Sequence, residues 1–119
     1  MEAGQDSQAL DRMFHALADA SRRGMVDRLS RGPASVKELA RPFSMALPSV
    51  LKHLAVLESG GIVLSEKVGR VRTYRMAPEA LSAIESWVAG RKAQLNRDFD
   101  RLEQYLLDQA DKLATGDDA

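Results

Sequence analysis

Apolar side chains recur with the period of an α-helix along the first sixty residues of the chain. Spacings of i, i+3, i+4 and i+7 predict a first helix that begins at Ser7 or Gln8. Similar but shorter patterns predict a second helix from Ser21, a short third helix capped by Ser35 and a fourth helix that begins near Ala46. Four short helices of this kind indicate a compact, mainly helical core.

The pattern changes from a period of 3.6 to a period of 2 after Gly60 and Gly61, which are expected to stop the fourth helix. Residues 62–68 and 71–76 alternate or are rich in residues that favour strands, and Gly69 lies between them. A glycine between two such runs is typical of a β-hairpin. The predicted fold class is therefore mainly α with a small β-hairpin.

A long amphipathic helix is expected to follow the hairpin, over about residues 78–108, with Pro78 in its first turn. Apolar residues seven positions apart predict a continuous seam along this helix. So long a seam exceeds what a small domain can cover, which favours a second copy of the chain as its partner. The polar residues 111–119 are expected to fray. The seam residues are Leu81, Val88, Leu95 and Leu102.

The order of these elements is that of a winged helix-turn-helix, in which the second helix of a tight pair enters the major groove of DNA. We expect a single domain over residues 1–119. Its DNA-binding core would cover about residues 10–76, and the last helix would serve dimerisation.

Composition excludes several classes of function. The chain has no cysteine and only two histidines, so disulfides, thiolate metal sites and cysteine nucleophiles are ruled out. No glycine-rich phosphate loop and no nucleophile elbow is present. We therefore expect no enzyme activity, no catalytic residues, no metal and no cofactor. The absence of a long apolar run and a polar, acidic N-terminus predict a cytoplasmic protein that does not bind membranes.

Charge is unevenly distributed although the 17 basic and 17 acidic residues cancel. Residues 20–75 hold eleven basic and four acidic residues, a net charge of +7, whereas the segments on either side are acidic. A basic middle segment is suited to double-stranded DNA or to an acidic protein partner.

Candidate DNA contacts lie on the outer face of the fourth helix and in the hairpin. Ser49 and Lys52 can reach base edges or phosphates, and basic side chains beside Gly69 suit phosphates or a minor groove. His53 is interpreted as a phosphate contact, with a neighbouring carbonyl as the alternative partner. The full set is Lys37, Pro48, Ser49, Lys52, His53, Lys67, Arg70 and Arg72.

Several segments resemble the ArsR/SmtB family of transcriptional repressors. Residues 14–23 read FHALADASRR, similar to the family's F-x-A-L-A-D-P-T-R opening, and residues 36–40 resemble its third helix. Residues 45–63 read MALPSVLKHLAVLESGGIV, similar to its recognition helix and the exit from it, and residues 69–76 resemble its wing. The resemblance implies a homodimeric repressor that binds a palindromic operator.

Two features refine this resemblance. The Leu-Pro-Ser start of the recognition helix and the long last helix with Trp87 resemble the cysteine-free branch of the family. The positions that hold cysteine pairs in metal-sensing members carry KELA here, and no histidine follows His53, so the metal sites of the family do not carry over. The implied dimer would be joined through the first and last helices, and a small-molecule effector is compatible with it. The expected interface residues are Leu10, Phe14, Leu81, Trp87, Val88, Leu95, Phe99 and Leu102.

Alternative interpretations remain for some residues and for the function. Arg22 and Arg23 could contact DNA, but their place at a helix start favours a structural pair with a nearby carboxylate. A winged-helix adaptor that binds an acidic protein, without sequence-specific DNA binding, is the alternative function. The basic residues at the hairpin tip favour DNA.

Overall fold

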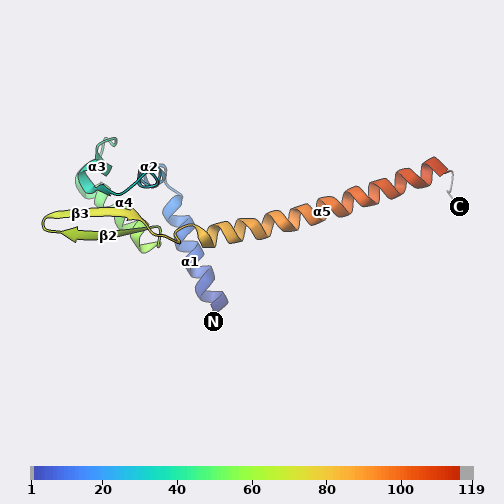
Figure 1. Cartoon of the computed structure of the whole chain (residues 1–119), viewed down its shortest axis with the longest axis horizontal. Helices are drawn as coiled ribbons and strands as arrows, with labels where there is room; N and C mark the ends of the chain where they lie inside the picture. The colour runs from blue at the N-terminus through green and yellow to red at the C-terminus, as the bar shows by residue number, and fades with distance from the viewer. Residues whose placement is uncertain (1, 116–119) are drawn as a thin grey trace. The chain divides into compact units, whose positions relative to one another are not determined.

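The structure is a computed structural model that describes residues 2–115 (Figure 1). The chain divides into two compact units, one up to Ile84 and one from Glu85 onward. The first unit contains four helices and a small sheet, and the second is part of a single helix.

The first two helices are α1 (Glu2–Leu17) and α2 (Ala20–Leu29). Helix α1 begins five residues before Ser7, the earlier of the two predicted starts. The cap of α2 is Asp19 rather than the predicted Ser21. The backbone of Asp19 is extended, and its carboxylate accepts a hydrogen bond from the Arg22 N–H at 3.0 Å. The helix therefore begins at Ala20, directly after this cap.

A complete capping box opens the short helix α3 (Val36–Ala40). Ser35 is the predicted N-cap, and the structure adds a reciprocal bond with Glu38. The Glu38 N–H donates to Ser35 Oγ at 3.2 Å, and the Ser35 N–H donates to Glu38 Oε1 at 2.8 Å. The hydrogen bond from the Ser35 backbone N–H, and after it one from the Ser35 side chain, lower the pKa of the Glu38 carboxyl below its usual range. The reciprocal bonds hold this five-residue helix at its start.

Helix α4 (Leu47–Ser59) carries the predicted buried stripe of Val50, Leu54 and Leu57. Ala46 is its N-cap and contributes no side-chain hydrogen bond. The helix stops at the predicted glycines, where Gly61 adopts a φ of 77° that other residues rarely adopt.

The hairpin has the predicted form, with β2 (Val63–Val68) and β3 (Val71–Met76) joined by a two-residue turn. Gly69 has a φ of 63° at the first central position of the turn, which suits a hairpin turn with glycine there. A third strand, β1 (Ala34–Ser35), pairs with β3 and gives the order β1-β3-β2. Strand β1 is not predicted from the sequence, because two residues show no periodicity.

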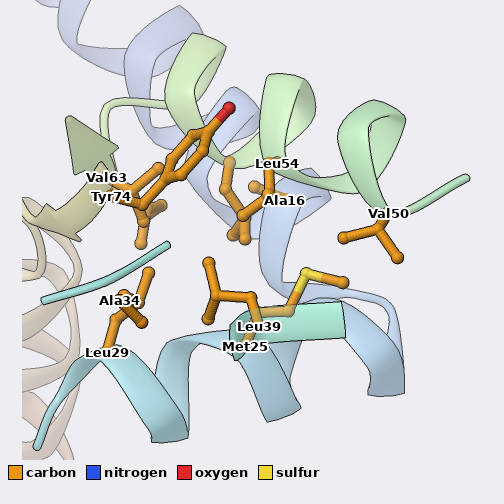
Figure 2. Close-up of a cluster of buried hydrophobic side chains, with 11 residues drawn as sticks. Ala16, Met25, Leu29, Ala34, Leu39, Val50, Leu54, Val63 and Tyr74 are labelled. Atoms are coloured by element: carbon orange, nitrogen blue, oxygen red, sulfur yellow. The ribbon is translucent and has the colours of Figure 1, made fainter. Parts of the chain in front are cut away.

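The core lies between α4, the sheet and helices α2 and α3, and Figure 2 shows its side chains. Val50 and Leu54 of α4 face Met25 of α2 and Leu39 of α3, and all four are buried. The Tyr74 ring of β3 is also buried, which raises the pKa of its hydroxyl above the usual 10.0. Side chains of α2, α3 and β3 thus fix the position of α4.

Helix α5 (Ser82–Thr115) begins four residues later than Pro78, the predicted start. The preceding segment forms turns instead, in which the Ala80 N–H donates to Ala77 O at 3.0 Å and the Ser82 N–H donates to Glu79 O at 3.2 Å. Leu81 therefore precedes the helix and is not part of its seam. The segment expected to fray is helical as far as Thr115, and residues 116–119 lie outside the described part.

Candidate nucleic-acid interface

The outer face of α4 is exposed opposite the buried stripe. Pro48, Ser49 and Lys52 are all exposed, as the DNA-binding prediction requires. Because Val50, Leu54 and Leu57 anchor the helix from the other side, these outer side chains are held in a fixed order along a rigid support. The helix therefore offers one hydroxyl and one ammonium group to a ligand on this face.

His53 lies at the edge of this face, half-buried, and contacts Arg22. The Arg22 Nη1 atom lies 3.2 Å from His53 Nδ1. A guanidinium has no acceptor, so Arg22 donates, Nδ1 accepts and the ring proton is on Nε2. The partner of Nδ1 is thus a guanidinium, not the neighbouring carbonyl considered as the alternative, and Nε2–H is the donor that could make the predicted phosphate contact.

Arg22 and Arg23 bind the C-terminal end of α1. Arg22 Nε donates to Ala16 O at 2.7 Å and Arg22 Nη2 to His15 O at 3.1 Å, while Arg23 Nη1 donates to Leu17 O at 2.7 Å. The structural role expected of both arginines is observed, but their partners are carbonyl groups rather than a carboxylate. The last carbonyls of a helix lack partners within it, and a cation there also suits the helix dipole.

The Asp19 carboxyl lies beside this cluster. Its pKa is lowered, chiefly by the hydrogen bond from the backbone N–H of Arg22, with a smaller contribution from the charge of Arg22. An ionised carboxylate therefore caps α2 at neutral pH.

The basic residues of the hairpin differ in their surroundings. Lys67 and Arg72 are exposed and stand directly opposite each other in the β2–β3 ladder. Arg72 Nη1 donates to Ser65 Oγ at 2.8 Å, and Ser65 Oγ donates to Glu58 Oε2 at 2.9 Å. This chain of hydrogen bonds directs Arg72 toward a carboxylate of α4, whereas Arg70 is exposed in the turn itself.

Lys37, the last of the predicted DNA contacts, is exposed on α3. All eight predicted positions lie in the compact unit that ends at Ile84, on α3, α4 and the hairpin. Seven are exposed and His53 is half-buried. The Arg22–His53 pair and the link from Arg72 to Glu58 are not predicted from the sequence, since no local pattern signals a contact between distant residues.

The predicted dimer positions fall in both units. In the first unit, Leu10 is half-buried, and Phe14 and Leu81 are exposed. In the second, no residue of α5 is buried, and the Arg91 guanidinium carbon lies 5.2 Å from the centre of the Trp87 ring. The exposed apolar side chains of α5 within this unit include Val88, Leu95, Phe99, Leu102, Tyr105 and Leu106.

The described residues form neither a metal site nor a membrane-spanning helix. Between residues 2 and 115, no group of three or more histidine, aspartate and glutamate side chains is arranged to hold a metal ion. None of the helices in that part of the chain combines the length and apolar character that a membrane span requires.

Known proteins are similar to this chain in sequence and in fold. Residues 17–66 match the profile of a helix-turn-helix domain. The HTH-type transcriptional regulator Rv2034 of Mycobacterium tuberculosis (strain ATCC 25618 / H37Rv) is 41% identical over 76 residues, which cover 64% of this chain and 71% of that protein. The crystal structure of the ArsR family transcriptional regulator RHA00566 superimposes with a TM-score of 0.73 at 47% identity, covering 76% of this chain and 93% of that one. The chain belongs to the ArsR family.

Two further relatives are informative. The arsenical resistance operon repressor of Escherichia coli (strain K12) is 35% identical over 78 residues, 65% of this chain and 63% of the repressor. The homodimeric winged helix-turn-helix DNA-binding domain Mb0332 of Mycobacterium bovis has a TM-score of 0.61 at 27% identity, covering 78% of this chain and 87% of that domain. The predictions of a winged helix-turn-helix fold and of an ArsR-family DNA-binding transcriptional regulator are confirmed.

Proposed function

We propose that this ArsR-family regulator is a repressor that binds a palindromic operator as a homodimer, with α4 in the major groove. The observation that carries the proposal is the outer face of α4, where Ser49 and Lys52 are exposed on a helix anchored by a buried stripe. A hydroxyl and an ammonium group so held can reach base edges or close phosphates.

The hairpin supplies the second set of contacts in this proposal. Arg70 in the turn and Lys67 beside it are exposed cations, suited to phosphates or to a minor groove. Lys37 on α3 adds a phosphate contact.

A homodimer is supported by the apolar surface of α5. Val88, Leu95 and Leu102 are seven residues apart and exposed along this helix. Burying such a seam against a second copy would remove a large apolar area from water. Phe14 and Leu10 of α1 are proposed to join the same interface, and the relative Mb0332 is homodimeric. Sedimentation at micromolar concentration should give about twice 13.1 kDa, and a monomer there would contradict the dimer.

A dimer predicts the form of the operator. Two recognition helices on one face of the duplex require half-sites about 10 bp apart, or a multiple of that spacing, in inverted orientation. Footprinting with the full chain on the DNA upstream of its own gene should reveal such a site. Binding to both this site and random duplex should weaken steeply with salt. An adaptor for acidic proteins would instead protect no site and would bind an acidic protein in preference to duplex.

Operator binding is proposed to be independent of metal. Zn²⁺ sites usually have three or four protein ligands, most of them cysteine sulfur or histidine nitrogen. The chain has no cysteine and two histidines. Affinity for the operator should therefore be the same with added Zn²⁺ and with a chelator. A tenfold shift in either condition would contradict this part of the proposal.

A further inference from the structure

The first two turns of α4 expose apolar side chains beside the polar Ser49 and Lys52. Leu47 is 47% exposed and Leu51 is 42% exposed, and Pro48 between them is exposed as well. The buried face of the helix is already occupied by Val50 and Leu54, so the two leucines are not needed for the core. They lie on the flank of α4, between the buried stripe and the surface that carries Lys52.

The start of α4 is also poor in hydrogen-bond donors. The N-cap Ala46 has no polar side chain, and Pro48 has no N–H. The N–H groups of Ser49 and Val50 both donate to Ala46 O, at 2.9 and 3.3 Å. This helix start is therefore unlike a phosphate-binding one, and the polar side chains that it offers over two turns are Ser49 and Lys52.

The major groove of DNA has one apolar feature at its base edges, the C5 methyl group of thymine. Leu47 and Leu51 are four residues apart and so lie on the same face of α4. Their separation along the helix is about 6 Å at 1.5 Å per residue, close to two base-pair steps of about 3.4 Å. Lys52 lies nearby, and residues 20–75 carry a net charge of +7. Both features favour DNA over an apolar protein as the partner that covers these two leucines.

We propose that Leu47 and Leu51 are specificity-determining residues of this regulator, which receive thymine C5 methyl groups one to two base steps apart in each half-site. The inference rests on the proposed placement of α4 in the major groove. Burying a methyl group against leucine discriminates thymine from cytosine and from uracil without any hydrogen bond. Arginine and asparagine, the usual readers of guanine and adenine, are absent from this face of α4.

The test uses the full chain and duplexes enriched by it from a random 30-bp library. Each thymine of an enriched duplex is replaced in turn by deoxyuridine, which removes the C5 methyl group and leaves every hydrogen-bonding edge unchanged. We expect the Kd to rise about fourfold at each contacted thymine, the effect of losing one buried methyl group. Leu51→Ala should abolish this sensitivity at one thymine of each half-site and Leu47→Ala at another.

Matched variants make the result specific. Leu51→Met keeps an apolar side chain of similar volume and should keep the sensitivity to deoxyuridine. Leu64→Ala removes a side chain of similar exposure, 38%, from β2 and should also keep it. Because the altered side chains are exposed, each variant should show the thermal midpoint of the natural chain, measured by circular dichroism.

The outcomes separate this inference from the proposed function. Affinity that deoxyuridine leaves unchanged at every position, or sensitivity that persists in the Leu47→Ala/Leu51→Ala variant, would overturn the inference and leave the proposed function standing. The same holds if the double variant binds duplex as tightly as the natural chain, since the leucines would then serve another partner. Failure to enrich any duplex would overturn both.

Discussion

The Arg22 guanidinium donates to the His53 imidazole, with Nη1 and Nδ1 3.2 Å apart, although 31 positions separate the two residues in the chain. The same guanidinium binds the carbonyls of His15 and Ala16 at the end of α1. One side chain thus connects the end of α1 and the start of α2 to the helix proposed to enter DNA. Its planar set of donors is suited to three acceptors at once.

Replacing Arg22 tests this connection. Arg22→Lys keeps the charge but cannot bind all three acceptors, so we expect a loss of about 1–3 kcal/mol in the free energy of unfolding. Urea denaturation provides the measurement. Arg23→Lys is the matched control, because Arg23 binds one carbonyl of α1 and is exposed. An equal loss in both variants would mean that the contact with His53 contributes nothing measurable.

The Asp19 cap gives a defined dependence of stability on pH. Its pKa in the folded chain lies below the usual 3.8, so the ionised form is held more strongly by the folded than by the unfolded state. The resulting stability is complete above pH 3.8 and is lost as the pH falls through the lowered pKa. Asp19→Asn keeps an acceptor for the Arg22 N–H but does not ionise. The difference in free energy of unfolding between the natural chain and the Asp19→Asn variant should therefore shrink below pH 3.8. Urea titrations at several pH values measure this difference.

Two leucines three positions apart on α4 should respond very differently to truncation. Leu54 is fully buried, and Leu54→Ala should cost about 2–5 kcal/mol of unfolding free energy. Leu51 is exposed, and Leu51→Ala should change the free energy of unfolding by less than about 0.5 kcal/mol. Comparable losses in denaturant titrations of the two variants would contradict the observed orientation of α4.

Gly60 is required by a close approach between helices. A Cβ there would lie 3.1 Å from both Ala16 Cβ and Arg12 O of α1, so Gly60→Ala must displace α1 at a cost of about 1–3 kcal/mol. Gly90 in α5 is the control, because a Cβ there meets nothing within 4 Å. Gly90→Ala should stabilise the helix by roughly 0.5–1 kcal/mol. Thermal melts of the two variants should therefore shift in opposite directions.

Removing basic side chains should distinguish base contacts from phosphate contacts. Lys52→Ala should narrow the difference in affinity between operator and random duplex, since loss of a base contact costs about 1–3 kcal/mol of discrimination. Arg70→Ala should weaken both complexes alike and reduce the salt slope by about one unit. Fluorescence anisotropy at several salt concentrations measures both quantities. Operator binding unchanged in both variants, with the fold intact, would refute the proposed contacts.

The sequence predicts best the features that depend on local physics. The stripe of Val50, Leu54 and Leu57 is periodic, Ser35 and Glu38 are spaced as a capping box, and Gly69 sits between two strand-like runs. Each feature rests on residues close together in the chain, so a short window is sufficient to detect it.

Element boundaries were predicted less well where two local solutions compete. Asp19 and Ser21 are both good N-caps, and the backbone of Asp19 is extended in the structure, which decides between them. Pro78 can begin a helix, but turns over residues 77–81 delay α5 to Ser82. In both cases propensity alone allowed two answers that differ little in free energy.

By itself, the sequence determined the class of fold, the buried face of the recognition helix and the basic character of the segment that carries it. Only the tertiary structure decided that Arg22 binds His53, that Arg72 is directed toward Glu58 and that Gly60 leaves room for α1. These relationships join residues from different elements, whose separation is set by the packing of the whole core. Since periodicity reports on one helix or strand at a time, it carries no information about which side chains meet across that core.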